Sequence, residues 1–314
     1  MEEAPFFDDV AQGPPNGRAL WLDAADGVRI RFGHWPKRGR RKVRGTVLLF
    51  PGRTEYIEKY GPAAAFFTAE GYDLIAVDWR GQGLADRANE DRLLGHIGHF
   101  DEYQTDVACV IEAVRDLGLP EPYYLLGHSM GGCIGLRSLH EALPVKAAVF
   151  SAPMWGIGIA TWMRPVAWSL SWLNHRIGRG MTLSPATKRE SYTQIAPFED
   201  NQLTKDRKMW DFMVGQLDAH PDLALGGPSI TWLYTALVEC GALQAKTPPD
   251  YPALTFLGED ERIVAKEPVR RIMGRWQNGR LIEVPKAEHE IMMEVPQTRD
   301  DFYRRTSDFF SENG

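Results

Sequence analysis

Short apolar runs alternate with helical patterns along the first half of the chain. The runs contain few polar residues, which is typical of strands buried on both faces of a parallel sheet. The expected strands are residues 46–50, 74–79, 123–126 and 147–150, and the expected helices are residues 59–70, 102–117 and 130–142. This β-α-β-α order predicts a doubly wound α/β fold with a mostly parallel sheet. Residues 19–22 and 29–35, separated by Asp26-Gly27, predict a preceding hairpin.

The alternation stops after Pro153 and resumes near residue 253. The 96 residues 155–250 contain no clear buried strand and are rich in Trp, Met, Pro and Gly. The later expected elements are strands at 253–257 and 280–284 and helices at 267–276 and 297–310. We therefore predict one α/β core, residues 1–154 and 251–314, with a largely helical cap, residues 155–250, inserted between two late strands.

One serine lies in the sequence context of a nucleophile. Residues 127–131 read Gly-His-Ser-Met-Gly and fit the pattern G-x-S-x-G, which is weak evidence when it stands alone. Here the pattern follows an expected strand and begins an expected helix, with Gly131 and Gly132 in the first turn, as in the nucleophile elbow of serine hydrolases. The sequence therefore predicts Ser129 as a nucleophile, and the helix N-terminus brings positive potential near its reacting oxygen.

A serine hydroxyl is a poor nucleophile until a base accepts its proton, and the base needs an acid to orient it. His289 is the candidate base, because it lies shortly after the last expected strand and is the only histidine in the C-terminal quarter of the chain. The acid is expected after the preceding strand, where the three neighbouring carboxylates Glu259, Asp260 and Glu261 compete.

Acyl transfer also needs hydrogen-bond donors for the developing oxyanion. The candidates are the backbone N–H of Met130, one residue after the nucleophile, and that of Arg53, in the loop after the first parallel strand. This chemistry requires no metal and no organic cofactor. The three widely spaced cysteines, Cys109, Cys133 and Cys240, fit no zinc site and suggest a reducing compartment.

These motifs occur together in a known family. From about residue 20 to residue 310 the sequence resembles the bacterial lysophospholipase and monoacylglycerol lipase branch of the serine α/β-hydrolases, and the lysophospholipase type is the closer match. The resemblance rests on residues 50–55, 59–60, 78–83, 95–96, 100–103, 127–132, 201–206, 226–232, 258–264 and 287–294. It implies the α/β-hydrolase fold, with the helical cap inserted between late strands.

The resemblance also orders the candidate acids. Its register, with an apolar pair two residues after the acid, selects Glu261 and leaves Asp260 as the alternative, although Asp is the usual residue in the family. Many lipases of the family have His-Gly where this chain has Pro51-Gly52. The lysophospholipase type shares Pro-Gly-Arg, so this departure favours that type.

The insert holds six of the ten tryptophans of the chain. Such residues either pack the core of the cap or form an apolar tunnel and rim for an acyl chain. We expect Trp155, Trp162, Met163 and Trp232 to contact substrate. An apolar surface above a serine nucleophile favours a lipid-like acyl ester over a small polar ester.

These observations predict a serine carboxylic-ester hydrolase that cleaves the acyl ester of a monoacyl lipid, a lysophospholipid or a monoacylglycerol, through an acyl-enzyme. A proline iminopeptidase-like serine peptidase and a small-ester esterase stay open as alternatives. A non-catalytic binding protein fits least, because it has no need of Ser, His and acid in these contexts.

The formal net charge of −6 argues against nucleic acid as a partner. One basic segment stands out and is either a solvated loop or a peripheral contact with anionic lipid. Its basic residues are Lys37, Arg38, Arg40, Arg41, Lys42 and Arg44. The acidic N-terminus lacks a signal-peptide pattern and no apolar run has the length of a membrane span, so we expect a cytoplasmic protein, with the inner face of the membrane as its place of contact.

Overall fold

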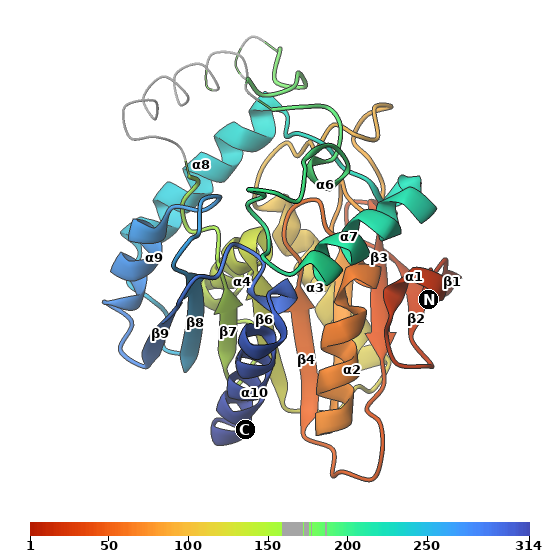
Figure 1. The fold of residues 1–314 in the computed structure, drawn as a ribbon, viewed down its shortest axis with the longest axis vertical. Coiled ribbons are helices and arrows are strands. Elements are labelled where there is room, and N and C mark those ends of the chain that lie inside the picture. The colour runs from red at the N-terminus through yellow and green to blue at the C-terminus, as the bar shows by residue number, and fades with distance from the viewer. Residues whose placement is uncertain (159–171, 173–175, 177, 186) are drawn as a thin grey trace.

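The computed structural model describes residues 1–158, 172, 176, 178–185 and 187–314. In these residues one nine-stranded sheet runs through the molecule, in the order β1-β2-β3-β5-β4-β6-β7-β8-β9 (Figure 1). The first three strands and the β3–β5 pair are antiparallel, and every pair from β5 to β9 is parallel. The strands are β1 (Glu2–Ala4), β2 (Arg18–Asp23), β3 (Arg29–Trp35), β4 (Gly45–Phe50), β5 (Tyr72–Asp78), β6 (Tyr123–His128), β7 (Ala148–Ser151), β8 (Ala253–Gly258) and β9 (Gly279–Val284).

Helices cover both faces of this sheet (Figure 1). In the described residues they are α1 (Asp8–Ala11), η1 (Ile57–Tyr60), α2 (Gly61–Glu70), α3 (Glu102–Asp116), α4 (Ser129–His140), α6 (Tyr192–Ile195), α7 (Arg207–Ala219), η3 (Pro221–Leu223), α8 (Ile230–Ala245), α9 (Lys266–Met273), η4 (Ile291–Met293) and α10 (Pro296–Glu312). Among them, none is long and apolar enough to cross a membrane.

The central strand β4 is apolar from Val47 to Phe50, and both faces of the sheet bury these side chains. Val47 and Leu49 belong to an apolar cluster with side chains of α2 and α10, whereas Leu48 and Phe50 belong to a cluster with α3, α4, α8 and α9. Successive side chains of a strand point to opposite faces, so a strand covered on both sides buries all of them. Each such side chain stabilises the fold by about 1.5–3 kcal/mol relative to exposure.

The described part of the segment between β7 and β8 lies over the carboxyl ends of the parallel strands (Figure 1). Its last helix, α8, packs Trp232, Ala236 and Cys240 into the same apolar cluster as the core helices. Cross-segment bridges join Ile157 to Val264 and Gly95 to Pro228. The described part of this segment therefore packs against the core and is bridged to it by backbone hydrogen bonds.

The structure contains each strand and helix that the apolar pattern predicts, with shifts of up to three residues at the ends. It confirms the predicted fold class, a mostly parallel α/β sheet covered by helices. Several short elements were not predicted, among them β1, α1, α6, η3 and η4, because three or four residues carry no readable period.

Candidate active site

Ser129 stands at a sharp turn between β6 and α4. Its φ of +47° lies in the left-handed region, which is costly for a residue with a side chain and which occurs at functional sites where the surroundings enforce it. The glycine that follows permits close packing: a Cβ on Gly131 would lie 1.9 Å from the carbonyl oxygen of Phe50 at the end of β4. The turn therefore holds the hydroxyl at the carboxyl edge of the sheet.

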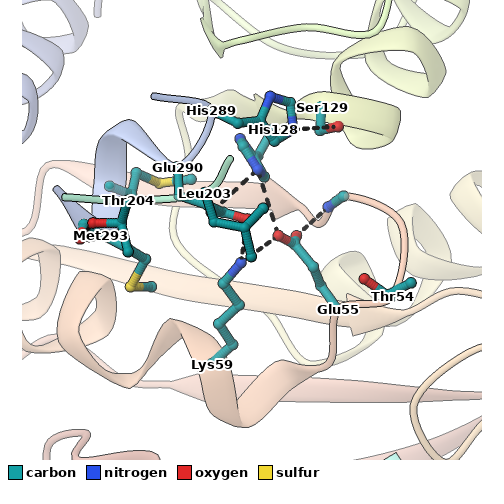
Figure 2. Close-up of polar contacts among 12 residues, drawn as sticks. Thr54, Glu55, Lys59, His128, Ser129, Leu203, Thr204, His289, Glu290 and Met293 are labelled. Atoms are coloured by element: carbon teal, nitrogen blue, oxygen red, sulfur yellow. Dashed lines mark hydrogen bonds and ion pairs between the residues drawn. The ribbon is translucent and has the colours of Figure 1, made fainter. Parts of the chain in front are cut away.

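His289 lies between Ser129 and a carboxylate, and Figure 2 shows its contact with Ser129. Its Nε2 lies 2.9 Å from Ser129 Oγ, and its Nδ1 lies 2.6 Å from an oxygen of Glu261. The three residues follow β6, β8 and β9, whose carboxyl ends lie at one edge because the strands are parallel. All three are buried, so the contacts are shielded from water.

The environment of Glu261 keeps it ionised. Burial would raise its pKa, but the charge of His289 and hydrogen bonds to the carboxylate outweigh burial and hold the pKa below 4.5. The backbone N–H groups of Ile263 and Val264 donate to its second oxygen at 2.6 and 3.0 Å. An ionised, fixed carboxylate can orient His289 and stabilise its protonated form.

Asp260, the alternative acid, points elsewhere. Its side chain is 44% exposed and forms an ion pair with Lys205. The structure therefore brings Glu261, and not Asp260, to His289.

The two candidate oxyanion donors, the backbone N–H groups of Arg53 and Met130, follow the carboxyl ends of the neighbouring strands β4 and β6. Met130 is in the first turn of α4, where backbone N–H groups have no acceptor within the helix. Arg53 follows β4, and the loop before it is held by Trp79 Nε1, which donates to Pro51 O at 3.0 Å, and by Gln82 Nε2, which donates to Gly52 O at 2.8 Å. These bonds engage the carbonyls of the loop and fix the direction of its N–H groups.

An ionic cluster lies directly beneath these residues, and sequence reasoning did not predict it (Figure 2). It consists of Glu55, Lys59, His128 and Glu290. Lys59 Nζ is bonded to Glu55 and lies 2.7 Å from Glu290, and His128 Nε2 lies 3.4 and 3.3 Å from the same two carboxylates. All four side chains are buried.

The ionic cluster connects the oxyanion loop to the base. Glu55 accepts hydrogen bonds from Gly52 N and Tyr60 Oη, and Glu290 is the residue after His289. Burial would lower the pKa of His128, but Glu290 and Glu55 outweigh it and raise that pKa above 6.5. With Lys59 and His128 charged, two cations face two carboxylates.

One group of described residues has the spacing of a metal site. Ligand atoms of Glu55, His128 and Glu290 lie within 4.8 Å of one another. Lys59 Nζ already supplies the cation between the two carboxylates, at 2.7 Å from Glu290. These residues therefore do not require a metal ion to balance their charge.

A cavity of about 720 Å³ opens above Ser129 and His289. Much of its wall is apolar and comes from both the core and the segment between β7 and β8. The apolar residues of this wall include Met154, Ile157, Leu203, Met213, Leu217, Leu233, Ile263 and Val264.

The four expected substrate contacts differ in outcome. Trp232 lines the cavity. For Trp155 the expectation is wrong: this side chain is fully buried against Phe150 and Trp276, and its Nε1 donates to Gly132 O at 3.0 Å. The chain reaches the cavity at Met154 and Ile157, and the Trp155 side chain between them packs into the core instead. Trp162 and Met163 lie outside the described residues.

The chain is similar in sequence to a family of serine hydrolases and to two bacterial lysophospholipases. A family model described as "Serine aminopeptidase, S33" (Hydrolase_4) matches residues 41–296. The chain is 29% identical over 316 residues to the probable lysophospholipase L2 of Haemophilus influenzae, covering 99% of this chain and 95% of that one. It is 28% identical over 299 residues to lysophospholipase L2 of Escherichia coli, covering 92% and 86%.

A solved structure supports the same fold. A soluble variant of monoglyceride lipase from Saccharomyces cerevisiae, in complex with a substrate analogue, has a TM-score of 0.75 at 19% identity and covers 99% of both chains. This likeness confirms the predicted α/β-hydrolase fold.

Proposed function

Because the chain belongs to the Hydrolase_4 (serine aminopeptidase, S33) family, we propose that it is a serine carboxylic-ester hydrolase acting on a monoacyl lipid, a lysophospholipid or a monoacylglycerol. One observation carries the proposal: the Ser129–His289–Glu261 chain of hydrogen bonds ends in a cavity of about 720 Å³ with an apolar wall. The lysophospholipase relatives support the choice of substrate.

The reaction follows from this geometry. Ser129 Oγ attacks the ester carbonyl carbon while His289 Nε2 takes the hydroxyl proton, and the N–H groups of Arg53 and Met130 hold the resulting oxyanion. The bond to the glycerol oxygen breaks, and that oxygen leaves with the proton from His289. Water then attacks the acyl-enzyme with His289 as base, which releases the fatty acid and restores Ser129. Glu261 stays ionised and orients His289 throughout.

The apolar wall supports a long acyl chain. Burying one methylene group stabilises a complex by about 0.8 kcal/mol, so a chain of many methylenes binds much more tightly than a short one. We propose that residues 155–250 act as a cap over the site, since Ile157, Met213 and Leu233 of this segment contribute to the wall.

The peptidase alternative has less support. An aminopeptidase needs a carboxylate that is free to bind the substrate amine. The carboxylates of Glu55 and Glu290 line the cavity, but both are bonded to Lys59. A small-ester esterase is the second candidate, and chain-length preference distinguishes it.

A substrate panel tests the proposal. Lysophospholipids, monoacylglycerols, short p-nitrophenyl esters and proline p-nitroanilide are compared, with Ser129→Ala as the matched control. We expect fatty acid release from monoacyl lipids that Ser129→Ala abolishes. Release of nitroaniline alone would contradict the proposal, and so would a preference for acetyl over long acyl esters.

Membrane contact through the basic segment stays a prediction, as does a cytoplasmic location. The segment joins β3 to β4 at the edge of the sheet opposite Ser129 (Figure 1), and Arg41 and Arg44 pair with Glu70. Contact there would leave the cavity facing away from the bilayer. Sedimentation with phosphatidylglycerol vesicles tests it: R38Q/R40Q/K42Q should sediment less than the unaltered protein, and equal sedimentation would contradict the contact.

A further inference from the structure

The acidic and basic side chains that line the cavity are of two kinds, paired and unpaired. Four of the five that line it are paired: Glu55, Lys59 and Glu290 in the ionic cluster, and His289 with Glu261. The fifth is Arg53, which forms no ion pair with any acid of the described residues. Glu55, the nearest acid along the chain, directs its oxygens to Gly52 N, Lys59 and Tyr60.

Neutral groups hold the Arg53 guanidinium. One of its terminal nitrogens, Nη2, donates to Gly226 O at 2.6 Å, and the guanidinium lies over the Trp232 ring, 5.1 Å from the centroid. A Cβ on Gly95 would lie 2.3 Å from Nη2, so the glycine makes room for it. Burial lowers the pKa of Arg53 to about 10, which leaves it charged at neutral pH. Its Nε is buried and has no acceptor in the described part of the chain.

A second polar atom of the cavity also lacks a partner. Ser184 lines the cavity, is 2% exposed, and its Oγ has no hydrogen-bond partner among the residues described. Its backbone N–H donates to Pro228 O at 2.9 Å, two residues from the carbonyl that Arg53 contacts. The turn at Gly226, Gly227 and Pro228 therefore contacts both residues, Arg53 through Gly226 O and Ser184 through Pro228 O.

Buried donors without acceptors are costly unless a ligand satisfies them. We propose that Arg53 and Ser184, the Arg53 site, bind the phosphate of the substrate's head group and so select a phosphorylated monoacyl lipid over a neutral monoacylglycerol. The guanidinium offers planar donors that match phosphate oxygens, and the hydroxyl offers one more. This inference rests on the proposed function, because it assumes that the ester carbonyl lies at Ser129.

The backbone of Arg53 strengthens the assignment. The N–H of this residue is the candidate oxyanion donor, so its guanidinium is one side-chain length from the carbonyl being attacked. In a glycerophospholipid the phosphate is separated from the ester by the glycerol carbons, a comparable span. One residue can therefore contact the reacting end and the head group of the same lipid.

The test compares two substrates that differ only in phosphate. Monoacylglycerol and the corresponding lysophosphatidic acid, with one medium-length acyl chain below micellar concentration, are assayed for kcat/KM. Lysophosphatidylcholine is a third arm that distinguishes a phosphodiester from a phosphomonoester. We expect the unaltered enzyme to prefer the phosphorylated lipids, and Arg53→Gln to reduce that preference about tenfold or more. Arg53→Lys should restore part of the preference, and Ser184→Ala should reduce it by a smaller factor.

Arg87→Gln is the matched control. Arg87 is a second partly buried arginine whose pKa burial lowers to about 10; its guanidinium contacts backbone carbonyls, and it does not line the cavity. We expect Arg87→Gln to leave the ratio of the two kcat/KM values unchanged. Equal losses on both substrates in Arg53→Gln would show that Arg53 only supports the loop, and would overturn the inference.

A binding measurement on the unaltered protein covers two remaining cases. If Arg53→Gln does not fold, or if no fatty acid is released from either lipid, protection of Ser129 from a fluorophosphonate probe is measured with decyl phosphate and with decanol. At least tenfold better protection by decyl phosphate supports the Arg53 site even where the proposed function fails. Equal protection contradicts it.

Discussion

Lys59 and Arg53 are two cations, six residues apart, that line the same cavity in opposite circumstances. Lys59 is held by Glu55 and Glu290, so its charge is balanced within the protein. Arg53 contacts a carbonyl and an aromatic ring and has no ion pair in the described chain. A paired buried charge therefore holds loops in place, whereas an unpaired one is available to recognise a ligand.

Two neighbouring carboxylates, Glu261 and Asp260, also differ in their partners, and this difference gives the largest expected change in kcat. Glu261→Gln should lower kcat about 10³- to 10⁴-fold, because a neutral amide cannot stabilise protonated His289. Asp260→Asn, one residue earlier, should stay within about twofold, because Asp260 pairs with Lys205 at the surface. Steady-state kinetics on one monoacyl ester measures both. Similar losses in the two variants would contradict the assignment of the acid.

Removing the cation of the ionic cluster should destabilise the protein strongly. Lys59→Met leaves the buried Glu55 and Glu290 with His128 as the one remaining cation of the ionic cluster, which costs about 3–5 kcal/mol of the free energy of unfolding. Urea unfolding measures this loss, and fluorophosphonate labelling of Ser129 measures the effect on the site. The double variant Lys59→Met/Glu290→Gln should lose less than the single one. A loss below about 1 kcal/mol in Lys59→Met would show that the cluster is not a structural anchor.

The ionic cluster should also set a pH window for stability. Burial would raise the pKa of Glu290, but Lys59 and His128 hold it well below 4.5, so its contribution is present above pH 4.5 and is lost as pH falls through the folded pKa. The pKa of His128 is raised above 6.5, so its contribution is complete below pH 6.5 and is lost as pH rises through the folded pKa. The cluster therefore contributes most between these values.

Unfolding free energies measured from pH 4 to pH 9 test this window. His128→Gln should flatten the fall at high pH and leave the fall at low pH in place. If the free energy of unfolding of this variant still fell at high pH as it does in the unaltered protein, a group other than His128 would be responsible.

The apolar wall should determine chain-length preference. Leu233→Ala removes apolar surface from the cavity and should lower kcat/KM for a long acyl ester by up to about tenfold relative to an acetyl ester. Val238→Ala is the matched control, since Val238 lies on the same helix and is 40% exposed. Equal effects on long and short esters would place the acyl chain elsewhere.

The smallest effect concerns the stability contribution of Arg53. Arg53→Gln removes a charge that no carboxylate balances, so the free energy of unfolding should change by less than about 1.5 kcal/mol. Comparison with Lys59→Met in the same urea series sharpens the contrast between the two cations. A loss as large as that of Lys59→Met would mean that both cations anchor the loop.

The sequence predicted the sheet and the Ser129–His289–Glu261 contacts for a clear reason. Apolar runs reveal strands with two covered faces, and the carboxyl ends of parallel strands meet at one edge. Residues that follow β6, β8 and β9 are therefore brought together by topology alone. Glu261 needed the register of the family as well, because three carboxylates follow β8.

The ionic cluster could not be predicted in this way. Glu55 and Lys59 are four residues apart, which is a readable signal, but Glu290 lies 231 residues after Lys59 and meets it only in the folded chain. Composition misled in the case of Trp155, where an excess of tryptophan suggested substrate contact and packing against Trp276 decided otherwise.

The central claim is that Ser129 attacks the ester of a monoacyl lipid bound in the apolar cavity. Intact-protein mass spectrometry after rapid acid quenching tests it most directly, with a monoacyl lipid as substrate and Ser129→Ala as control. We expect a transient mass increase equal to the acyl group minus one hydrogen, located on the peptide that contains Ser129 and absent from the control. Turnover of the lipid with no acyl-enzyme at any quench time, or turnover that persists in Ser129→Ala, would contradict it.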